Sequence, residues 1–333
     1  MLIWGDKSDL FSHCVALGLA TILANEGRRV RIGWQGDRQV CIETDDGLDD
    51  AGIAESVIAY AKKVQIGGWV AKETFGCWEG NNSSPLSPRV GKDFSDNCVE
   101  YGRRRRRLFD GEMKNDRLAQ TLFSNLGRPS YWSLKGYGNK KEPAPDYGAS
   151  NWEMFNRARG SNFVGTYYSK MCQKVVGVLP DAEAAQALRG EGFTECMEGD
   201  LLTHGLCSKS TPVDLLQLWC AVHSFDCFPT RPVVSAISAS TPSNSTGYLR
   251  IDGKVGYFCI PVFNDLVYFE RFKAALRSKA LYEACAAGMK HAGALNGADL
   301  PDGVASIYAF ERAVDDSMTS NVLYWAKSGK RVF

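Results

Sequence analysis

Residues 9–27 read DLFSHCVALGLATILANEG, a long apolar run that starts at an aspartate and ends at a glycine. Asp9 is a suitable N-cap, and the leucines that follow recur with the spacing of a helix face, so the run predicts a helix. Ala16, Gly18 and Ala20 are small enough to let another element approach this helix closely. The Glu26-Gly27 pair ends the helix.

The segments on either side of this helix predict a mixed fold. Residues 1–4 favour a short strand, and residues 30–34 and 39–43 alternate as strands around a four-residue turn. Residues 51–63 form an amphipathic helical pattern. We therefore predict an α+β fold, with a mixed domain over residues 1–175 and a second packed α/β region over residues 176–333.

The rest of the chain divides into helical, hairpin and irregular segments. Asp252-Gly253 marks the turn of a hairpin over residues 247–263. The stretches 67–102 and 133–150 are rich in glycine, asparagine and proline, and predict loops; residues 304–333 fit either a helix or two strands. Helices are expected at residues 118–126, 152–159, 181–189, 212–224 and 265–287.

Composition indicates a globular protein with a sizeable core. The chain has 333 residues, 44% of them hydrophobic, and a net charge of +1. Its eleven cysteines are an odd number without a CxxC pair, which favours a reducing cytoplasm over a disulfide framework. The apolar run at 15–24 follows Asp6 and Asp9 and is too short to span a bilayer. We expect a cytoplasmic protein with no membrane partner.

The basic segment, residues 101–141, dominates the charge distribution. It holds eleven cations, five of them consecutive arginines, against three acids, a net charge of about +8. Aromatic residues are interleaved with the cations. Cations neutralise phosphates and aromatic rings stack on unpaired bases, so the segment predicts nucleic-acid binding within a long basic loop at about 80–150. A solvated loop is the alternative interpretation.

The candidate nucleic-acid-binding residues fall into three groups by side-chain chemistry. Cations would contact the phosphate backbone, aromatic residues would stack on bases, and amides and a hydroxyl would read base edges. The cations are Arg89, Arg103, Arg104, Arg105, Arg106, Arg107, Lys114, Arg117, Arg128 and Lys135; the aromatic residues are Tyr131, Trp132 and Tyr137; the polar residues are Asn81, Asn82 and Ser83.

A metal set is the second candidate site. His204 and Cys207 are followed after twelve residues by Cys220 and His223. Two nitrogen and two thiolate ligands at these separations could close a tetrahedral zinc site. The alternative is that Cys220 and His223 are packing residues of an apolar helix. Zinc is thus a candidate ligand, and no other cofactor is expected.

Catalytic motifs are missing from the sequence. It contains no phosphate-binding loop, HExxH helix, GxSxG elbow or dinucleotide-binding turn. The acidic pairs 45–46, 49–50 and 315–316 would suit a two-metal nuclease only if their carboxylates converged, and adjacent acids diverge on regular elements. We expect a protein that is not an enzyme. The alternatives are a metal-dependent nuclease and a zinc-stabilised RNA-binding protein.

Residues 212–276 carry a resemblance to a known family. An apolar helix runs into Phe228-Pro229-Thr230-Arg231-Pro232, followed by a hairpin ending in FCIPVF at residues 258–263 and by a basic helix. An N-terminal helix, a hairpin containing Trp34 and a Ser-Pro-Arg loop at 87–89 come before these elements in the sequence. The order of all these elements resembles that in the large subunits of type I-G (formerly I-U) CRISPR effector complexes.

The resemblance implies a non-catalytic subunit of a crRNA-guided surveillance complex (Cascade). Such a subunit contacts the short motif beside the DNA target, supports strand opening (R-loop formation) and helps to recruit the helicase-nuclease. Its implied partners are crRNA, target DNA and the other Cascade subunits. Guide pairing then supplies sequence specificity, while protein cations hold the duplex and the displaced strand.

Overall fold

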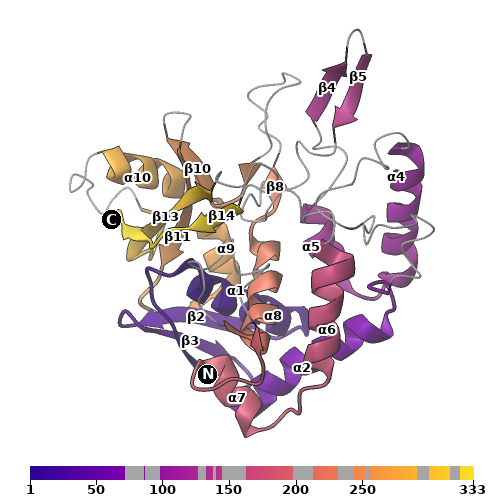
Figure 1. Ribbon diagram of the computed structural model, residues 1–333. Coiled ribbons are helices and arrows are strands. Elements are labelled where there is room, and N and C mark those ends of the chain that lie inside the picture. Colours follow the sequence, from indigo (N-terminus) through magenta and orange to yellow (C-terminus); the bar gives the residue numbers. More distant parts are fainter. Residues whose placement is uncertain are drawn as a thin grey trace.

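The computed structural model describes residues 1–71, 86, 98–126, 133–137, 140–144, 163–197, 213–231, 244–251, 255–290, 300–315 and 323–333. Helices pack beside antiparallel sheets in this part of the chain (Figure 1). The predicted α+β class is therefore confirmed. No helix of the described part is both long and apolar enough to cross a membrane.

The first sheet joins strands from both ends of the chain. Its order is β1 (Leu2–Trp4), β3 (Gln39–Thr44), β2 (Val30–Gln35) and β12 (Val267–Tyr268), with every pair antiparallel. The predicted β2–β3 hairpin is confirmed. Because β12 pairs with β2, the two predicted halves of the chain share a sheet and one hydrophobic core.

Helix α1 (Leu10–Asn25) lies at the centre of that core. Asp9 caps it by accepting hydrogen bonds from the backbone N–H groups of Phe11 and Ser12. Every residue from Leu10 to Leu23 is buried except Ser12. Gly18 touches helix α8 (Leu215–His223) so closely that a Cβ there would lie 1.6 Å from the Cys220 carbonyl oxygen. The predicted close approach at the small residues is confirmed.

A second antiparallel sheet lies in the C-terminal part of the chain. The predicted hairpin over 247–263 is formed by its strands β10 and β11, and the undecided segment after 304 forms strands rather than a helix. Strand β15 pairs with β13 on the edge opposite β11. Its strands are β10 (Tyr248–Ile251), β11 (Val255–Val262), β13 (Ser306–Asp315), β14 (Leu323–Ala326) and β15 (Lys330–Arg331).

Most predicted helices are present near their expected bounds. The exception is the single helix expected over 265–287, which breaks because Ser278 is extended and its Oγ accepts a hydrogen bond from Leu281 N, starting a new helix. The segment 152–159 lies outside the described residues. The helices are α2 (Asp50–Ile66), α6 (Ser169–Val176), α7 (Ala182–Arg189), α8 (Leu215–His223), α9 (Phe269–Arg277) and α10 (Lys279–Lys290), with π-helix η5 (Phe163–Tyr168) and 3₁₀-helix η7 (Ser224–Cys227).

The prediction of a long basic loop is wrong for the residues of this segment that the structure describes. The five arginines lie on helix α4 (Cys98–Arg107), followed by π-helix η2 (Leu108–Glu112) and helix α5 (Arg117–Leu126). Arginine is a good helix former and its charge is favourable in a last turn, so a cationic run is compatible with a helix. Residues expected to be loop form hairpin β4 (Ser133–Tyr137) and β5 (Lys140–Ala144), with a two-residue connection.

Two short strand pairs complete the described backbone. Strand β6 (Cys196–Met197) pairs with β7 (Val213–Asp214), which leads directly into α8. Strand β8 (Thr230–Arg231) pairs with β9 (Asn244–Ser245). Strand β8 lies between Pro229 and Pro232 in the sequence, and its extended backbone is the conformation favoured for a residue that precedes proline.

Candidate nucleic-acid interface

Helix α4 exposes one side of the arginine run. Arg103, Arg106 and Arg107 are exposed, and they are three and four residues apart, the spacing that places side chains on one face of a helix. We call these three residues the arginine face. Arg104, beside it, is half-buried. The run therefore presents its charge as an ordered stripe rather than as a loose loop.

Arg105 differs from its neighbours because it points into the protein. Its side chain is only 5% exposed, its guanidinium lies 4.9 Å from the centre of the Phe109 ring, and it donates a hydrogen bond to the Phe123 carbonyl oxygen. These contacts join α4 to α5. Arg105 was predicted to contact phosphate, but its place in the structure gives it a packing role that orients the arginine face.

Further cations follow the arginine face along the chain. Lys114, between η2 and α5, and Arg117, the first residue of α5, are exposed, as are the acids Asp110 and Glu112 on η2. From residue 103 to residue 117, the side chains that are not buried comprise six cations and these two acids, so their net charge is +4. The surface formed by α4, η2 and the start of α5 is therefore positive.

A buried polar side chain anchors this surface to the core. Asp116 Oδ1 accepts a hydrogen bond from Ala119 N at 3.0 Å, which caps α5, and another from the Tyr60 hydroxyl of α2 at 3.3 Å. Burial raises the pKa of the Asp116 carboxyl above its usual value. In the sequence Asp116 is one of the three acids of the basic segment, and its place immediately before residue 117 is an N-cap signal.

His223 continues the polar packing beneath α5. Its Nδ1 lies 2.7 Å from the Trp219 carbonyl oxygen, which can only accept, so Nδ1 donates and Nε2 accepts from the Tyr168 hydroxyl at 2.9 Å. Burial lowers the pKa of His223 to about 4, so the ring is neutral at physiological pH. Trp69 packs on Phe123 of α5, with 5.1 Å between ring centres.

These contacts bear on the predicted zinc set. Both ring nitrogens of His223 already have hydrogen-bond partners, and burial raises the pKa of the Cys220 thiol. To bind here, a zinc ion would have to displace a hydrogen-bond partner of the His223 ring and deprotonate the Cys220 thiol. His204 and Cys207 lie outside the described residues, so the zinc set stays a prediction. Among the residues that the structure does describe, no three His, Cys, Asp or Glu side chains form a group that could hold a metal ion.

The acidic pairs of the N-terminal part are engaged in separate contacts. Asp45 lies 3.5 Å from guanidinium nitrogens of both Arg29 and Arg31, whereas Asp46 pairs with Arg28. Asp49 caps α2, and Asp50 pairs with Arg189 at 3.1 Å. The two members of each pair thus have different partners, as expected for adjacent acids. Asp315 ends β13, and Asp316 lies outside the described residues.

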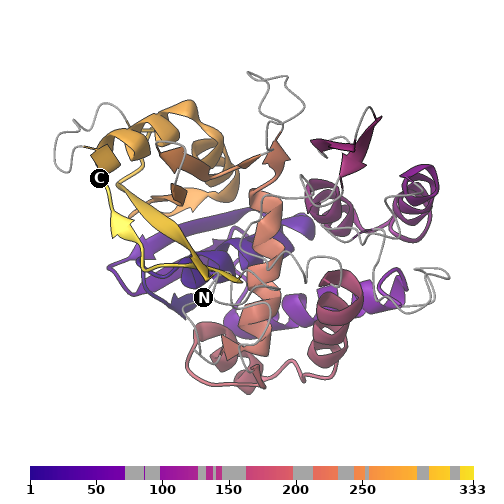
Figure 2. The ribbon, with the colours of Figure 1, turned by 45° about the horizontal axis from the view of Figure 1, so that its top comes forward.

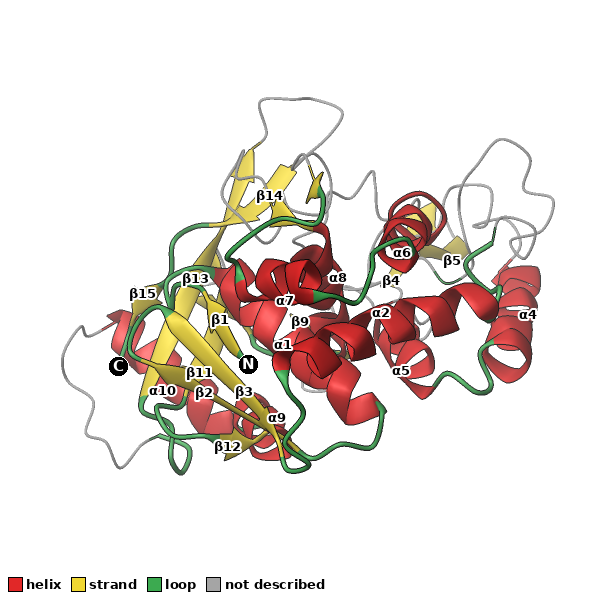
Figure 3. Cartoon of the chain, turned by 90° about the horizontal axis from the view of Figure 1, so that it is seen from below, coloured by secondary structure: helices red, strands yellow, loops and turns green. Residues whose placement is uncertain are grey.

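The hairpin β4–β5 contributes further cationic positions. Lys135 pairs with Glu142, and Tyr137 pairs with Lys140, in the strand register. In all three overall views the hairpin lies on the same side of the molecule as α4 and α5 (Figures 1, 2 and 3). The remaining predicted residues, Asn81, Asn82, Ser83, Arg89, Arg128, Tyr131 and Trp132, lie outside the described part of the chain.

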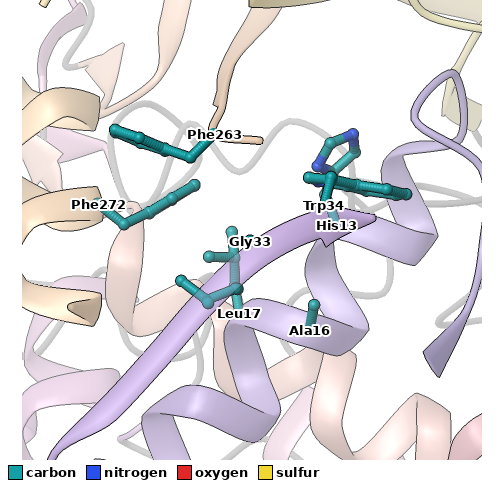
Figure 4. Close-up of a pocket in the computed structure, with 8 residues that line it drawn as sticks. His13, Ala16, Leu17, Gly33, Trp34, Phe263 and Phe272 are labelled. Carbon is teal, nitrogen blue, oxygen red and sulfur yellow. The ribbon is translucent and has the colours of Figure 1, made fainter. Parts of the chain in front are cut away.

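A small pocket beside α1 was not foreseen from the sequence. His13 and Trp34 form one wall of the pocket, and Phe263 and Phe272 form another (Figure 4). The pocket volume is about 260 Å³, which includes open solvent. The His13 Nε2 lies 2.9 Å from the Lys7 carbonyl oxygen, and burial lowers the His13 pKa to about 4. The pocket is smaller than a typical ligand site and its walls are mainly apolar. We assign it to core packing.

No protein-family model matches the chain, and no curated protein sequence matches it. The functional interpretation therefore depends on the surface formed by α4, η2 and α5 and on the resemblance described from residues 212–276.

Proposed function

We propose that this protein binds nucleic acid through the arginine face of α4. The observation that supports the proposal is the division of the arginine run, in which Arg105 is buried against α5 while Arg103, Arg106 and Arg107 are exposed on one side. A helix that fixes the backbone of these arginines suits binding to phosphate oxygens, because less backbone conformational freedom is lost when contacts form. Lys114 and Arg117 extend the same positive surface.

The finer proposal is that the chain is the non-catalytic large subunit of a crRNA-guided surveillance complex. It depends on the resemblance over residues 212–276. In that role the arginine face would hold DNA next to the guide-paired region, and other subunits would supply guide RNA and strand cleavage. The expected partners are crRNA, target DNA, the other Cascade subunits and the helicase-nuclease.

The arginine face is tested by the salt dependence of DNA binding. Each phosphate contact contributes about 0.9 to the slope of log affinity against log salt, so replacing Arg103, Arg106 and Arg107 together by alanine should reduce the slope by about 2 to 3. The loss should be similar for all duplex sequences, because phosphates carry no base identity. Fluorescence anisotropy with a labelled duplex at several salt concentrations measures both effects.

A control variant separates this surface from the total charge of the protein. Arg277, Lys279 and Lys330 are also exposed, and α10 lies on the opposite side of the molecule from α4 in Figures 1 and 3. Replacing these three by alanine removes the same charge and should leave the slope within experimental error. Equal slopes for both triple variants would refute the assignment of the interface to α4.

The complex itself is tested by co-purification. The tagged chain is expressed with the products of its genomic neighbours, and bound RNA is sequenced. One short, repeat-derived guide RNA in a stable assembly would support the subunit proposal. A protein that binds DNA with the expected salt slope but purifies without RNA or partners would overturn the subunit proposal and leave the interface intact.

A further inference from the structure

Two buried cysteines meet between the second sheet and the helix that covers it. Cys259 lies on β11 and Cys285 on α10, 26 positions apart in the chain, and both are fully buried. Their Sγ atoms are 2.6 Å apart. That separation is only about half an ångström longer than a disulfide bond of about 2.05 Å, and far shorter than an ordinary contact between two thiols.

Hydrogen bonds that do not involve sulfur hold the two cysteines in this arrangement. Gly247 N donates to the Tyr282 hydroxyl at 2.7 Å, and Cys259 N donates to the Gly247 carbonyl oxygen at 2.7 Å. Gly247 therefore contacts both the strand residue that bears one thiol and the helix that bears the other. Because Tyr282 is three residues before Cys285, the two share a face of α10.

The neighbours of Cys285 fix the same helix face against the sheet. Leu281, Ala284 and Cys285 are buried, and a Cβ at Gly288 would lie 2.2 Å from the Val332 carbonyl oxygen. Helix α10 is thus packed closely along its length. Both thiols are fully buried within this packing.

We propose that Cys259 and Cys285 are a disulfide-forming pair, a covalent modification site that fastens α10 to β11. The oxidant is a low-molecular-weight disulfide such as oxidised glutathione. One cysteine thiolate attacks it to form a mixed disulfide and releases one glutathione thiol; the second cysteine then displaces the other glutathione. The two protein thiols lose two protons and two electrons, and the oxidant is reduced to two thiols.

The environment of the pair determines when the bond forms. Burial raises the pKa of the Cys259 thiol well above its usual value, and the thiolate is the attacking species, so exchange in the folded protein is slow. Exchange is faster while α10 is undocked, during folding or local opening. In a reducing compartment the pair stays as two thiols, and exposure to an oxidant closes the bond.

Peptide mapping tests the proposal on the wild-type chain. The protein is unfolded, refolded with a mixture of reduced and oxidised glutathione, alkylated under denaturing conditions and digested with trypsin. Cleavage after lysine and arginine isolates Cys259 in peptide 255–271 and Cys285 in peptide 280–290, each with one cysteine. We expect these two peptides joined, with a mass about 2 Da below the sum of the reduced pair, and separated after reduction.

Matched variants establish specificity and consequence. Cys172→Ala removes another buried thiol and should leave the joined peptides unchanged, whereas Cys285→Ala should abolish them. The melting temperature of the refolded wild type should fall on adding reductant, and that of the Cys259→Ala/Cys285→Ala variant should not respond. Recovery of Cys259 and Cys285 as alkylated thiols, or of either one joined to a different cysteine, would overturn the proposal.

Discussion

Replacement of Arg105 by alanine should destabilise the protein far more than replacement of its neighbour Arg106. The Arg105 guanidinium is buried, donates to the Phe123 carbonyl oxygen and lies 4.9 Å from the centre of the Phe109 ring. Arg106, the next residue of the same helix, is exposed. The two variants remove the same charge from adjacent positions, so they separate packing from net charge.

The magnitude follows from the contacts that Arg105 loses. A hydrogen bond to a charged group contributes about 1.5–3 kcal/mol, and a partly buried cation–π contact about 1 kcal/mol. Relief of the desolvation cost of the buried guanidinium offsets part of this sum. We expect Arg105→Ala to lower the free energy of unfolding by about 2–3 kcal/mol, and Arg106→Ala to change it by less than about 0.5 kcal/mol.

Urea unfolding followed by tryptophan fluorescence and circular dichroism measures both values. Arg105→Lys is an informative intermediate, because lysine keeps the charge but lacks the planar group that contacts both the carbonyl and the ring. Equal unfolding free energies for Arg105→Ala and Arg106→Ala would refute the packing role. A salt slope of DNA binding that falls in Arg105→Lys as much as in Arg106→Ala would show that Arg105 itself contacts phosphate.

Three further predictions concern the core. Gly18→Ala should lower the free energy of unfolding by more than about 3 kcal/mol because its Cβ would meet backbone atoms of α8. Gly102 has open space around it, so Gly102→Ala should be neutral or should stabilise α4 by up to about 1 kcal/mol. Thermal unfolding compares the two variants. Burial lowers the pKa of His13 and of His223 to about 4. As pH falls, the histidines of the unfolded chain therefore bind protons before those of the folded protein do. Each histidine should lower the free energy of unfolding by about 3 kcal/mol between pH 6.5 and pH 4. A His223→Gln variant whose stability keeps the full wild-type pH slope in that range would contradict its neutral burial. Asp116→Ala should lower the free energy of unfolding in urea by about 2 kcal/mol, because α5 loses its N-cap and the Tyr60 hydroxyl loses an acceptor. An unchanged free energy of unfolding would show that these Asp116 contacts do not stabilise the protein.

Local patterns in the sequence sufficed for the elements that fold by short-range rules. The cap at Asp9 and the apolar period after it place α1 correctly, and the turns at 35–38 and 252–253 place both hairpins. Cap signals and helical periods depend on residues a few positions apart, so no distant contact is needed to read them. The acid pairs 45–46 and 49–50 also have separate partners, as expected for adjacent acids.

The candidate interface was only half predictable. Charge and aromatic content pointed to residues 101–141, but the same arginines that suggest a solvated loop are also strong helix formers. Five identical side chains carry no local mark that separates Arg105 from Arg106. The distinction arises because Phe109 and Phe123 lie on one side of α4, which is a property of how α4, η2 and α5 pack together.

Contacts between distant segments were decided by tertiary structure. The addition of β12 to the N-terminal sheet, the fit of Gly18 against α8 and the meeting of Cys259 with Cys285 join residues that are far apart in the chain. Composition and periodicity describe each segment by itself and record nothing about its partner. Backbone hydrogen bonds, close packing and thiol proximity depend on that partner, so they exist only once the chain has folded.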